Sequence, residues 1–464
     1  MHFRYVLQRG VNAVKPYVDP QWAWEAFRPT NANPWNTHKV AHLFRRAGFG
    51  LTSTELSNSI ASGLSETVHG LVHESGEPEA FQRDMQAMTR SLVASSDPAN
   101  LSSGWLYRML KSTDQLREKL TLFWHGHFAT SAEKVADAFM MQQQNSMLRQ
   151  HSLGNFHDLA QGISKDPAML LYLDSATNRK THPNENFARE LMELFCLGEG
   201  NYTEADIREL SRCFTGWEVR NRAYRFNRYQ HDFNEKSFLG ASKAFSGEEA
   251  VTHVIAQKSA PKFIARKLVQ YLVMDEPLAD DKLIEPLAKQ LEEDGFEILR
   301  TIERILHSNL FFSEHSYARK IKSPVEMAIG LMRSLDINTK LPDLHRTLGE
   351  VGQAVFYPPN VKGWEGGRIW INSSTLLGRS NLIHSLLTNP NTTFGGEDLS
   401  GLLASRDVHT MQQAFDHFEQ LLFAVPLGSR VKQQILSAHQ AAPSDESFSN
   451  LLHQLATLPQ FQLS

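Results

Sequence analysis

The segment PNENFARELMELFCLGEGNYTEADIRELSRCFTGW, residues 183–217, repeats apolar residues at helical spacing in two consecutive blocks. At about 100° per residue, each block has one apolar side and one polar side. Asn184 is a good N-cap for the first helix, Gly198 suits its end, and Thr203 suits the start of the second. The segment therefore predicts two amphipathic helices, which cover residues 184–198 and 203–217.

Helical periodicity continues on both sides of this segment. The sequence predicts a mainly α, multi-helical globular protein with a small extended or hairpin insert near residues 218–246, where aromatic and polar residues alternate. Three parts are expected along the chain: an irregular N-terminal leader (1–35), a main helical domain (36–390) and a C-terminal helical extension (391–464). Residues 356–374 contain two prolines, three glycines and two tryptophans, which predicts a fixed loop anchored by aromatic side chains.

The composition excludes several classes of function. Hydrophobic residues make up 41% and charged residues 21%, as in globular proteins, and a net charge of −4 gives nucleic-acid binding no support. No apolar run reaches the length of about 18 residues that a membrane span needs. The basic N-terminus lacks the apolar centre of a secretory signal, so the cytoplasm is the default compartment. No P-loop, nucleophile elbow, HExxH or Rossmann fingerprint is present.

The polar side of the first predicted helix carries a dense set of charged groups. Arg189 stands four residues from both Glu185 and Glu193, so one interpretation is a solvated face with ion pairs worth about 0.2–0.5 kcal/mol each. The alternative is a functional carboxylate cluster, because Glu190 and Glu193 are three residues apart and can converge on one metal ion or one water molecule. The pattern alone leaves both interpretations open.

Polar residues elsewhere in the chain could complete such a site. In FWHGHF, His127 falls on the apolar face of its predicted helix, either as a functional group or as a core histidine bonded to a backbone carbonyl. Asp174 and Asn178 directly follow an apolar run, either at the mouth of a core or as ordinary turn residues. The adjacent His231 and Asp232 form a weak metal-ligand signal.

The chain resembles a bacterial family catalogued as domain of unknown function number eighteen hundred. The resemblance spans about residues 42–381 and rests on six segments in the same order: HLFRRAGFG, FWHGHF, LGNFHDLAQGISKDPAMLLYLD, the 183–217 segment, HDFNEKSFLG and PPNVKGWEGGRIWI. It implies that the polar residues singled out by periodicity belong to family motifs. It also implies frequent genomic pairing with a family of sulfatase/alkaline-phosphatase-like fold, whose members often carry twin-arginine export signals. A chain exported with such a partner would be periplasmic or envelope-associated.

Two hypotheses of function follow. The first is a metal-assisted or acid–base enzyme with a His/Asp/Glu site in a helical cleft, where Mg²⁺, Mn²⁺ or iron would suit the oxygen-rich ligands. The second is a non-enzymatic envelope assembly or export factor that docks onto the sulfatase-like partner. Buried carboxylates and histidines that lie close together favour the enzyme, whereas an open stripe of Glu185, Arg189 and Glu193 favours docking.

The enzyme hypothesis assigns three groups of residues. The predicted catalytic residues are His127, Asp174, Glu185, Arg189 and Glu190. The predicted substrate or cofactor contacts are Asn178, Asn186 and Trp364, and the predicted metal ligands are Glu190, Glu193, His231 and Asp232.

Overall fold

Polar side chains mark the start of many helices in the computed structural model, which describes residues 18–73 and 76–464. Asp114, Asp137 and Asn155 each accept a hydrogen bond from a backbone N–H in the first turn of the helix that follows. Ser246 and Ser323 do the same within reciprocal capping boxes. These caps satisfy N–H groups that a helix would otherwise leave without partners.

Helices account for most of the described chain. In the first half they are α2 (Pro20–Trp24), α3 (Thr37–Ala47), α4 (Ser53–His73), α5 (Glu79–Ala94), α6 (Pro98–Lys111), α7 (Gln115–His127), α8 (Ala132–Val135), α9 (Ala138–His151), α10 (Phe156–Ser164), α11 (Pro167–Tyr172), α12 (Asn186–Glu190) and α13 (Glu204–Cys213). In the second half they are α14 (Gly247–Ile255), α15 (Ser259–Leu272), α16 (Asp281–Glu293), α17 (Ile298–His307), α18 (Pro324–Ser334), α19 (Leu341–Glu350), α20 (Ser373–Thr388), α21 (Leu399–Ala404), α22 (Met411–Leu422), α23 (Ser429–Ala438) and α24 (Asp445–Ala456). The π-helical turn η2 (Leu191–Cys196) continues α12, and short 3₁₀ turns are η1 (Ser175–Thr177), η3 (Gly367–Trp370) and η4 (Pro459–Gln462).

The extended insert consists of two antiparallel hairpins. Strand β1 (Trp217–Arg220) pairs with β2 (Ala223–Phe226), and β3 (Lys236–Phe238) pairs with β4 (Ala241–Lys243). A further short pair, β5 (Ile337–Asn338) with β6 (Thr393–Phe394), lies outside the insert. The helices and these small strand pairs confirm the predicted mainly α class. None of the described helices is both long enough and apolar enough to cross a membrane.

The second helix of the 183–217 segment is shorter than predicted. It ends at Cys213, and Trp217 already belongs to strand β1. The turn between them contains Gly216, whose φ of 81° lies in the left-handed region that ends a helix. Trp217 is nevertheless 1% exposed, so its place on the predicted apolar face corresponds to a buried position.

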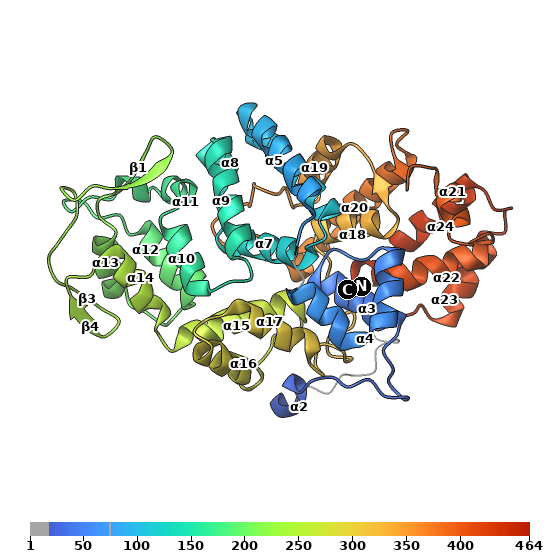
Figure 1. The fold of residues 1–464 in the computed structure, drawn as a ribbon, viewed down its shortest axis with the longest axis horizontal. Coiled ribbons are helices and arrows are strands. Elements are labelled where there is room, and N and C mark those ends of the chain that lie inside the picture. The colour runs from blue at the N-terminus through green and yellow to red at the C-terminus, as the bar shows by residue number, and fades with distance from the viewer. Residues whose placement is uncertain (1–17, 74–75) are drawn as a thin grey trace.

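Two clusters of buried apolar side chains organise the helices along the long axis of the molecule. One cluster draws mainly on α3, α7, α10 and α12–α17, and the other on α6, α9, α18 and α20–α24. In Figure 1, α12–α14 and both hairpins form one end, α21–α24 form the other, and α7 lies between them. Helix α7 contributes Leu120 to the first cluster and Leu122 to the second. Its C-terminal end therefore lies near the middle of the fold.

The predicted three-part division stays a prediction. The proposed boundary at residue 390 falls between α20 and β6, and the helices that follow pack against α3, α18 and α20. Residues 1–17 of the predicted leader lie outside the described residues. In the rest of it, Trp24 of α2 is buried and donates its indole N–H to the carbonyl of Leu283 in α16 at 2.7 Å.

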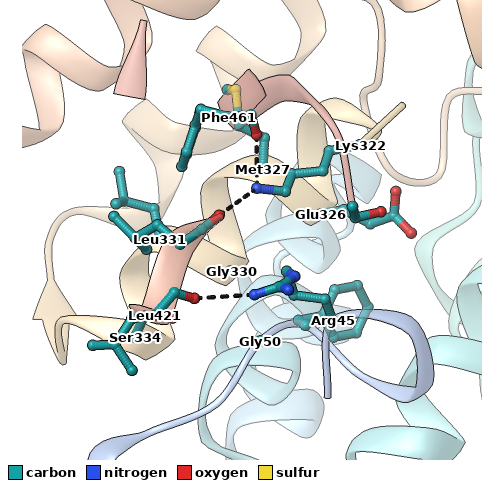
Figure 2. A pocket seen from close by; sticks show the side chains of 13 residues that line it. Arg45, Gly50, Lys322, Glu326, Met327, Gly330, Leu331, Ser334, Leu421 and Phe461 are labelled. Atoms are coloured by element: carbon teal, nitrogen blue, oxygen red, sulfur yellow. Dashed lines mark hydrogen bonds between the residues drawn. The ribbon is translucent and has the colours of Figure 1, made fainter. Parts of the chain in front are cut away.

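Basic side chains are buried where α3, α18 and the C-terminal helices meet (Figure 2). Arg45 donates to the carbonyl of Leu421 (3.3 Å), and Lys322 donates to two backbone carbonyls at 2.7 and 3.1 Å. They line a small cavity of about 20 Å³, in which Glu326 is the one acidic side chain. Glu326 forms an ion pair with Lys119 at 2.5 Å. Because buried cations are costly unless they are compensated, this carboxylate is expected to stabilise the interior.

Candidate functional site

The first helix of the 183–217 segment changes geometry halfway along its length. Its apolar side is buried as predicted, and Phe187 and Phe195 are at most 1% exposed. At Leu191, α12 passes into the π-helical turn η2, a local widening that occurs frequently at functional sites. The carbonyl of Phe195 lies in the last turn, where it has no partner within the helix, and it accepts a hydrogen bond from His127 Nε2 at 2.9 Å. This bond ties η2 to the end of α7.

One part of the polar face is an exposed ion-pair network. Arg189 donates to both carboxylate oxygens of Glu204 at 2.8 Å and lies 3.4 Å from Glu185. The hydrogen bond that Arg189 donates to Glu204 is the main reason that the pKa of Arg189 is raised. The three side chains are 35–63% exposed, and such surface pairs typically contribute about 0–1 kcal/mol. Glu185 and Arg189 thus have the arrangement expected of a solvated face.

The other part of the polar face is half-buried. Glu193 accepts a hydrogen bond from the hydroxyl of Tyr202 at 2.5 Å. Glu190, by contrast, has no hydrogen bond and no ion pair with any described residue. Burial and the charge of Glu193 raise the pKa of Glu190, and Arg189 and Lys362 only partly oppose them. A half-buried carboxylate without a protein partner is uncommon, because burying a charge is unfavourable unless it is paired.

The loop between α19 and η3 covers the end of α7 and reaches this carboxylate. The ring of Trp364 lies 5.6 Å from the ring of His125, and the backbone N–H of Phe356 donates to His125 Nε2 at 3.1 Å. Both contacts fix the loop on α7. Lys362, which belongs to the same loop, is thereby held near enough to Glu190 to lower the pKa of the Glu190 carboxyl group. Glu190 therefore lies near a residue of a loop that is distant in the sequence.

The close approach of this loop to α7 requires glycine at position 363. Gly363 has a φ of 74°, and a Cβ there would lie 2.0 Å from the carbonyl oxygen of Gly126. Gly366 has a similar φ of 78°, but the nearest atom to its Cβ would be 3.8 Å away.

Both alanine variants incur backbone strain of about 1–3 kcal/mol, and only Gly363→Ala must also displace the loop. Gly363→Ala is therefore expected to lower the free energy of unfolding in urea by about 1–2 kcal/mol more than Gly366→Ala. Equal losses in the two variants would show that this contact does not hold the loop.

His125 and His127 are both buried, at 1% and 8% exposed, but they face different neighbours. The pKa of each imidazole is lowered to about 3. Burial is the cause for His125; for His127 burial is the largest cause, nearby Lys267 acts in the same direction, and the hydrogen bond with Phe195 opposes both. Both rings are therefore neutral near pH 7. His127 donates from Nε2 to a carbonyl, whereas His125 accepts at Nε2 from the N–H of Phe356, so their hydrogen bonds assign opposite tautomers. Of the two interpretations of His127, the bond to a backbone carbonyl is the one observed.

A second charged group without a protein partner lies near His127. Lys267 on α15 places its ammonium 5.4 Å from the centre of the Phe263 ring, and it makes no hydrogen bond or ion pair within residues 18–73 and 76–464. Burial lowers its pKa. The adjacent Arg266 instead forms an ion pair with Asp281. Of these two adjacent basic residues, Lys267 is thus the one that remains available to an anionic group.

Asp174, Asn178 and Asn186 shape the loop before α12. Asp174 is exposed and forms an ion pair with Lys134 at 2.9 Å. Asn178 is fully buried and hydrogen-bonds two backbone groups at 2.9 and 3.0 Å. Asn186 donates to the carbonyl of Leu173 at 3.3 Å. Asn178 and Asn186 thus support the backbone and Asp174 is held by an ion pair, while the predicted functional roles of all three stay predictions.

His231 and Asp232 anchor the hairpin insert to α13. His231 Nδ1 lies 2.8 Å from the carbonyl of Thr215, and the N–H of Asp232 donates to the Thr215 hydroxyl at 2.8 Å. The carboxylate of Asp232 accepts from Arg212 Nε at 2.8 Å. Burial opposes ionisation of Asp232, but the Arg212 guanidinium and the other donors outweigh it and hold its pKa below the usual value.

The predicted metal ligands do not gather at one point. Within the part of the chain that the structure describes, no group of three or more His, Cys, Asp or Glu side chains could hold a metal ion. Glu190 and Glu193 lie at the loop that covers α7, whereas His231 and Asp232 are engaged by α13 and the turn after it. Local hydrogen bonds hold His231 and Asp232 at α13, and the assignment of these four residues as metal ligands stays a prediction.

Two residues of the site were absent from the predicted set. Tyr202 stands just before the N-cap of α13, and Lys362 stands in the PPNVKGW motif. Tyr202 lies beyond the turn that follows the first helix, and Lys362 lies in a distant segment, so helical periodicity gives no signal for either contact. Their position within family motifs was the one available indication.

Comparison with known proteins gives a family but no function. The family model described as "Protein of unknown function (DUF1800)" matches residues 42–463. No curated protein and no solved structure matches the chain.

Proposed function

The chain belongs to the DUF1800 family of proteins of unknown function, and we propose that it is an acid–base enzyme in which Glu190 exchanges a proton with the substrate. The observation that carries the proposal is the unpaired, half-buried state of the Glu190 carboxylate. A group of this kind keeps its hydrogen-bonding capacity for something other than the protein. Perturbed carboxylates of this type are common at sites of proton transfer.

Glu190 suits proton transfer better than the neighbouring histidine. A general acid or base works best when its pKa lies near the working pH. Burial and Glu193 move the pKa of Glu190 upward, toward neutrality, whereas burial moves that of His127 down to about 3. His127 is therefore assigned a neutral positioning role, in which it holds η2 through the carbonyl of Phe195.

The residues around Glu190 supply the other functions that such a reaction needs. Glu193, oriented by Tyr202, keeps a like charge beside Glu190 and so favours its protonated form. Lys362 and Lys267 are cations that would attract negative charge on the substrate or in the transition state. Trp364 would provide an apolar wall for the substrate. These roles point to a substrate that carries both an anionic and an apolar part.

Simple acid–base chemistry is preferred here to metal assistance. Among the described residues, Glu190 and Glu193 have no third His, Cys, Asp or Glu close enough to share an ion with them. A divalent metal usually takes six or more oxygen ligands, and two carboxylates alone supply only a few of them.

A reaction screen tests the proposal. The purified protein is incubated with a small-molecule extract of bacterial cells, and compounds that are consumed or formed over time are followed by mass spectrometry. Turnover is expected with the wild type and with Glu199→Gln, which changes an exposed carboxylate of the same segment, but not with Glu190→Gln. Equal turnover by Glu190→Gln would overturn the proposal. Dialysis against a chelator is expected to leave the turnover unchanged.

The docking alternative is supported by a different observation. Tyr229, Phe233 and Phe226 of the hairpin insert are 79%, 60% and 45% exposed, and exposed aromatic residues are typical of protein interfaces. A sulfatase-like partner that binds there would carry the chain to the envelope. Fractionation of cells that express both proteins tests this role, because retention of the chain in the cytosol while its partner is exported would contradict it.

A further inference from the structure

A cavity separate from the Glu190 site lies between α5, α6 and α9. It has a volume of about 510 Å³, within the usual range of small-molecule sites, and its lining comes from Met85–Leu92, Leu101–Arg108 and Gln142–Gln150. None of the residues assigned above to the Glu190 site lines it. Its walls also contain no aspartate and no glutamate.

One part of the cavity wall is apolar. Met85 from α5 and Leu101 and Trp105 from α6 are 1–3% exposed and form this part together with Leu92. The ring of Trp105 also lies edge-on to His125, at 5.2 Å between centroids. A ligand with an apolar body would be covered by these side chains, which are held in place by packing on α7.

The polar part of the wall carries more positive than negative charge. Arg149 donates to both oxygens of Glu118 at 2.6 and 3.0 Å, and Arg108 lies 3.4 Å from Glu77 and 3.9 Å from Glu118. Arg90, at the exposed rim, has no ion pair with any described residue. Two of the three guanidinium groups thus pair with two carboxylates that lie outside the cavity lining, and the third guanidinium has no carboxylate partner among the described residues. This surplus favours an anion inside the cavity.

An amide on α9 adds a hydrogen-bonding group to the same wall. Asn145 is 2% exposed, lines the cavity, and has no hydrogen-bond partner for its side-chain nitrogen among the described residues. Buried polar atoms are normally hydrogen-bonded, so a ligand atom is a physically reasonable partner for this amide.

We propose that this cavity binds a small organic acid, with its carboxylate near Arg90, Arg108, Arg149 and Asn145 and its short apolar tail against Met85, Leu101 and Trp105. An organic acid is preferred to a bare inorganic anion because a bare anion would leave the apolar part of the wall facing water. The arginines are preferred as the head-group site because their forked N–H groups match a carboxylate in geometry. The proposal does not depend on the function of Glu190.

Calorimetric titration of the full chain with octanoate, octan-1-ol and acetate tests both halves of the proposal. Octanoate is expected to bind with a Kd of about 1 mM or tighter. Octan-1-ol lacks the charge and acetate lacks the tail, so each is expected to bind at least tenfold more weakly. Absence of octanoate binding, or equal binding of acetate or octan-1-ol, would overturn the proposal.

Two variants place the binding in this cavity. Asn145→Leu removes an unpaired buried donor while keeping a similar volume, so it is expected to fold normally and to weaken octanoate binding about tenfold. Arg90→Gln, at the exposed rim, is expected to weaken binding several-fold and to reduce its dependence on salt. Gln143→Leu, on the same helix but outside the cavity, is the matched control and is expected to bind like the wild type. Wild-type affinity in both Asn145→Leu and Arg90→Gln would show that octanoate binds elsewhere.

Discussion

Glu190→Gln is expected to reduce turnover of the substrate by about 10²–10⁴-fold, the usual contribution of a positioned general acid or base. Glutamine keeps the size of the side chain but cannot exchange the proton. Since Glu190 forms no hydrogen bond or ion pair with the described residues, its replacement removes no stabilising contact. The variant is therefore expected to unfold at or slightly above the wild-type temperature. Parallel measurement of rates and of thermal unfolding separates loss of chemistry from loss of structure.

Glu193→Gln provides the control that links the rate to the pKa of Glu190. Removing the charge at position 193 removes one of the two causes that raise this pKa, so the limb of the pH–rate profile that belongs to Glu190 is expected to move to lower pH. The exposed pair around Arg189 offers a contrast, because Glu204→Gln changes a salt bridge of the same segment and is expected to leave the profile in place. An unchanged profile in Glu193→Gln would contradict the assigned role of the carboxylate pair.

Glu326→Gln is expected to lower the free energy of unfolding by about 3–5 kcal/mol at neutral pH, the usual effect of leaving a buried charge unpaired. Lys119, which is 1% exposed, would lose its ion-pair partner, and Arg45 and Lys322 would lose the one acidic side chain that lines their cavity (Figure 2). Replacing Lys119 with methionine in the same chain is expected to restore only part of the loss, because the other buried cations remain. Chemical denaturation of the single and double variants measures this coupling.

The effect of Glu326→Gln is also expected to depend on pH. Burial would raise the pKa of Glu326, but Lys119 and Lys320 outweigh it and lower the pKa from its ordinary 4.5 to about 2. A depressed carboxylate pKa stabilises the fold above about pH 4.5, and this stabilisation disappears as the pH falls toward 2. The difference between wild type and Glu326→Gln is therefore expected to shrink below pH 4.5. Glu285→Gln, which breaks an exposed ion pair with Lys262, is expected to change stability by less than about 1 kcal/mol at any pH.

The sequence predicts the elements of the fold well, because each depends on local pattern. The apolar face that contains Phe187 and Leu191 is buried, and the alternating residues after Trp217 form hairpins. The one clear boundary error, at the end of α13, comes from a glycine turn at Gly216 that ends the helix four residues early.

The arrangement of the site could be predicted only in part, because it depends on tertiary contacts. Helical spacing pairs Arg189 with both Glu185 and Glu193. The structure shows the pair with Glu185, but the closest carboxylate to Arg189 is that of Glu204, and Glu193 accepts a hydrogen bond from Tyr202 instead. Both new partners lie beyond the glycine turn that separates the two helices, where no periodicity connects them to the first helix. The loop residue Lys362 lies more than 150 positions from Glu190, and only the packing of the loop on α7 brings them near each other.

Titration of Glu190 itself tests the central claim without any knowledge of the substrate. The carboxyl signals of ¹³C-labelled glutamate can be followed by NMR across the acidic pH range, with Glu190 assigned by the signal missing from Glu190→Gln. The expected result is a pKa above the ordinary 4.5, which falls in Glu193→Gln. A pKa at or below 4.5 would mean that the ionised carboxylate is stabilised by the protein, and would contradict its role as the proton-transferring group.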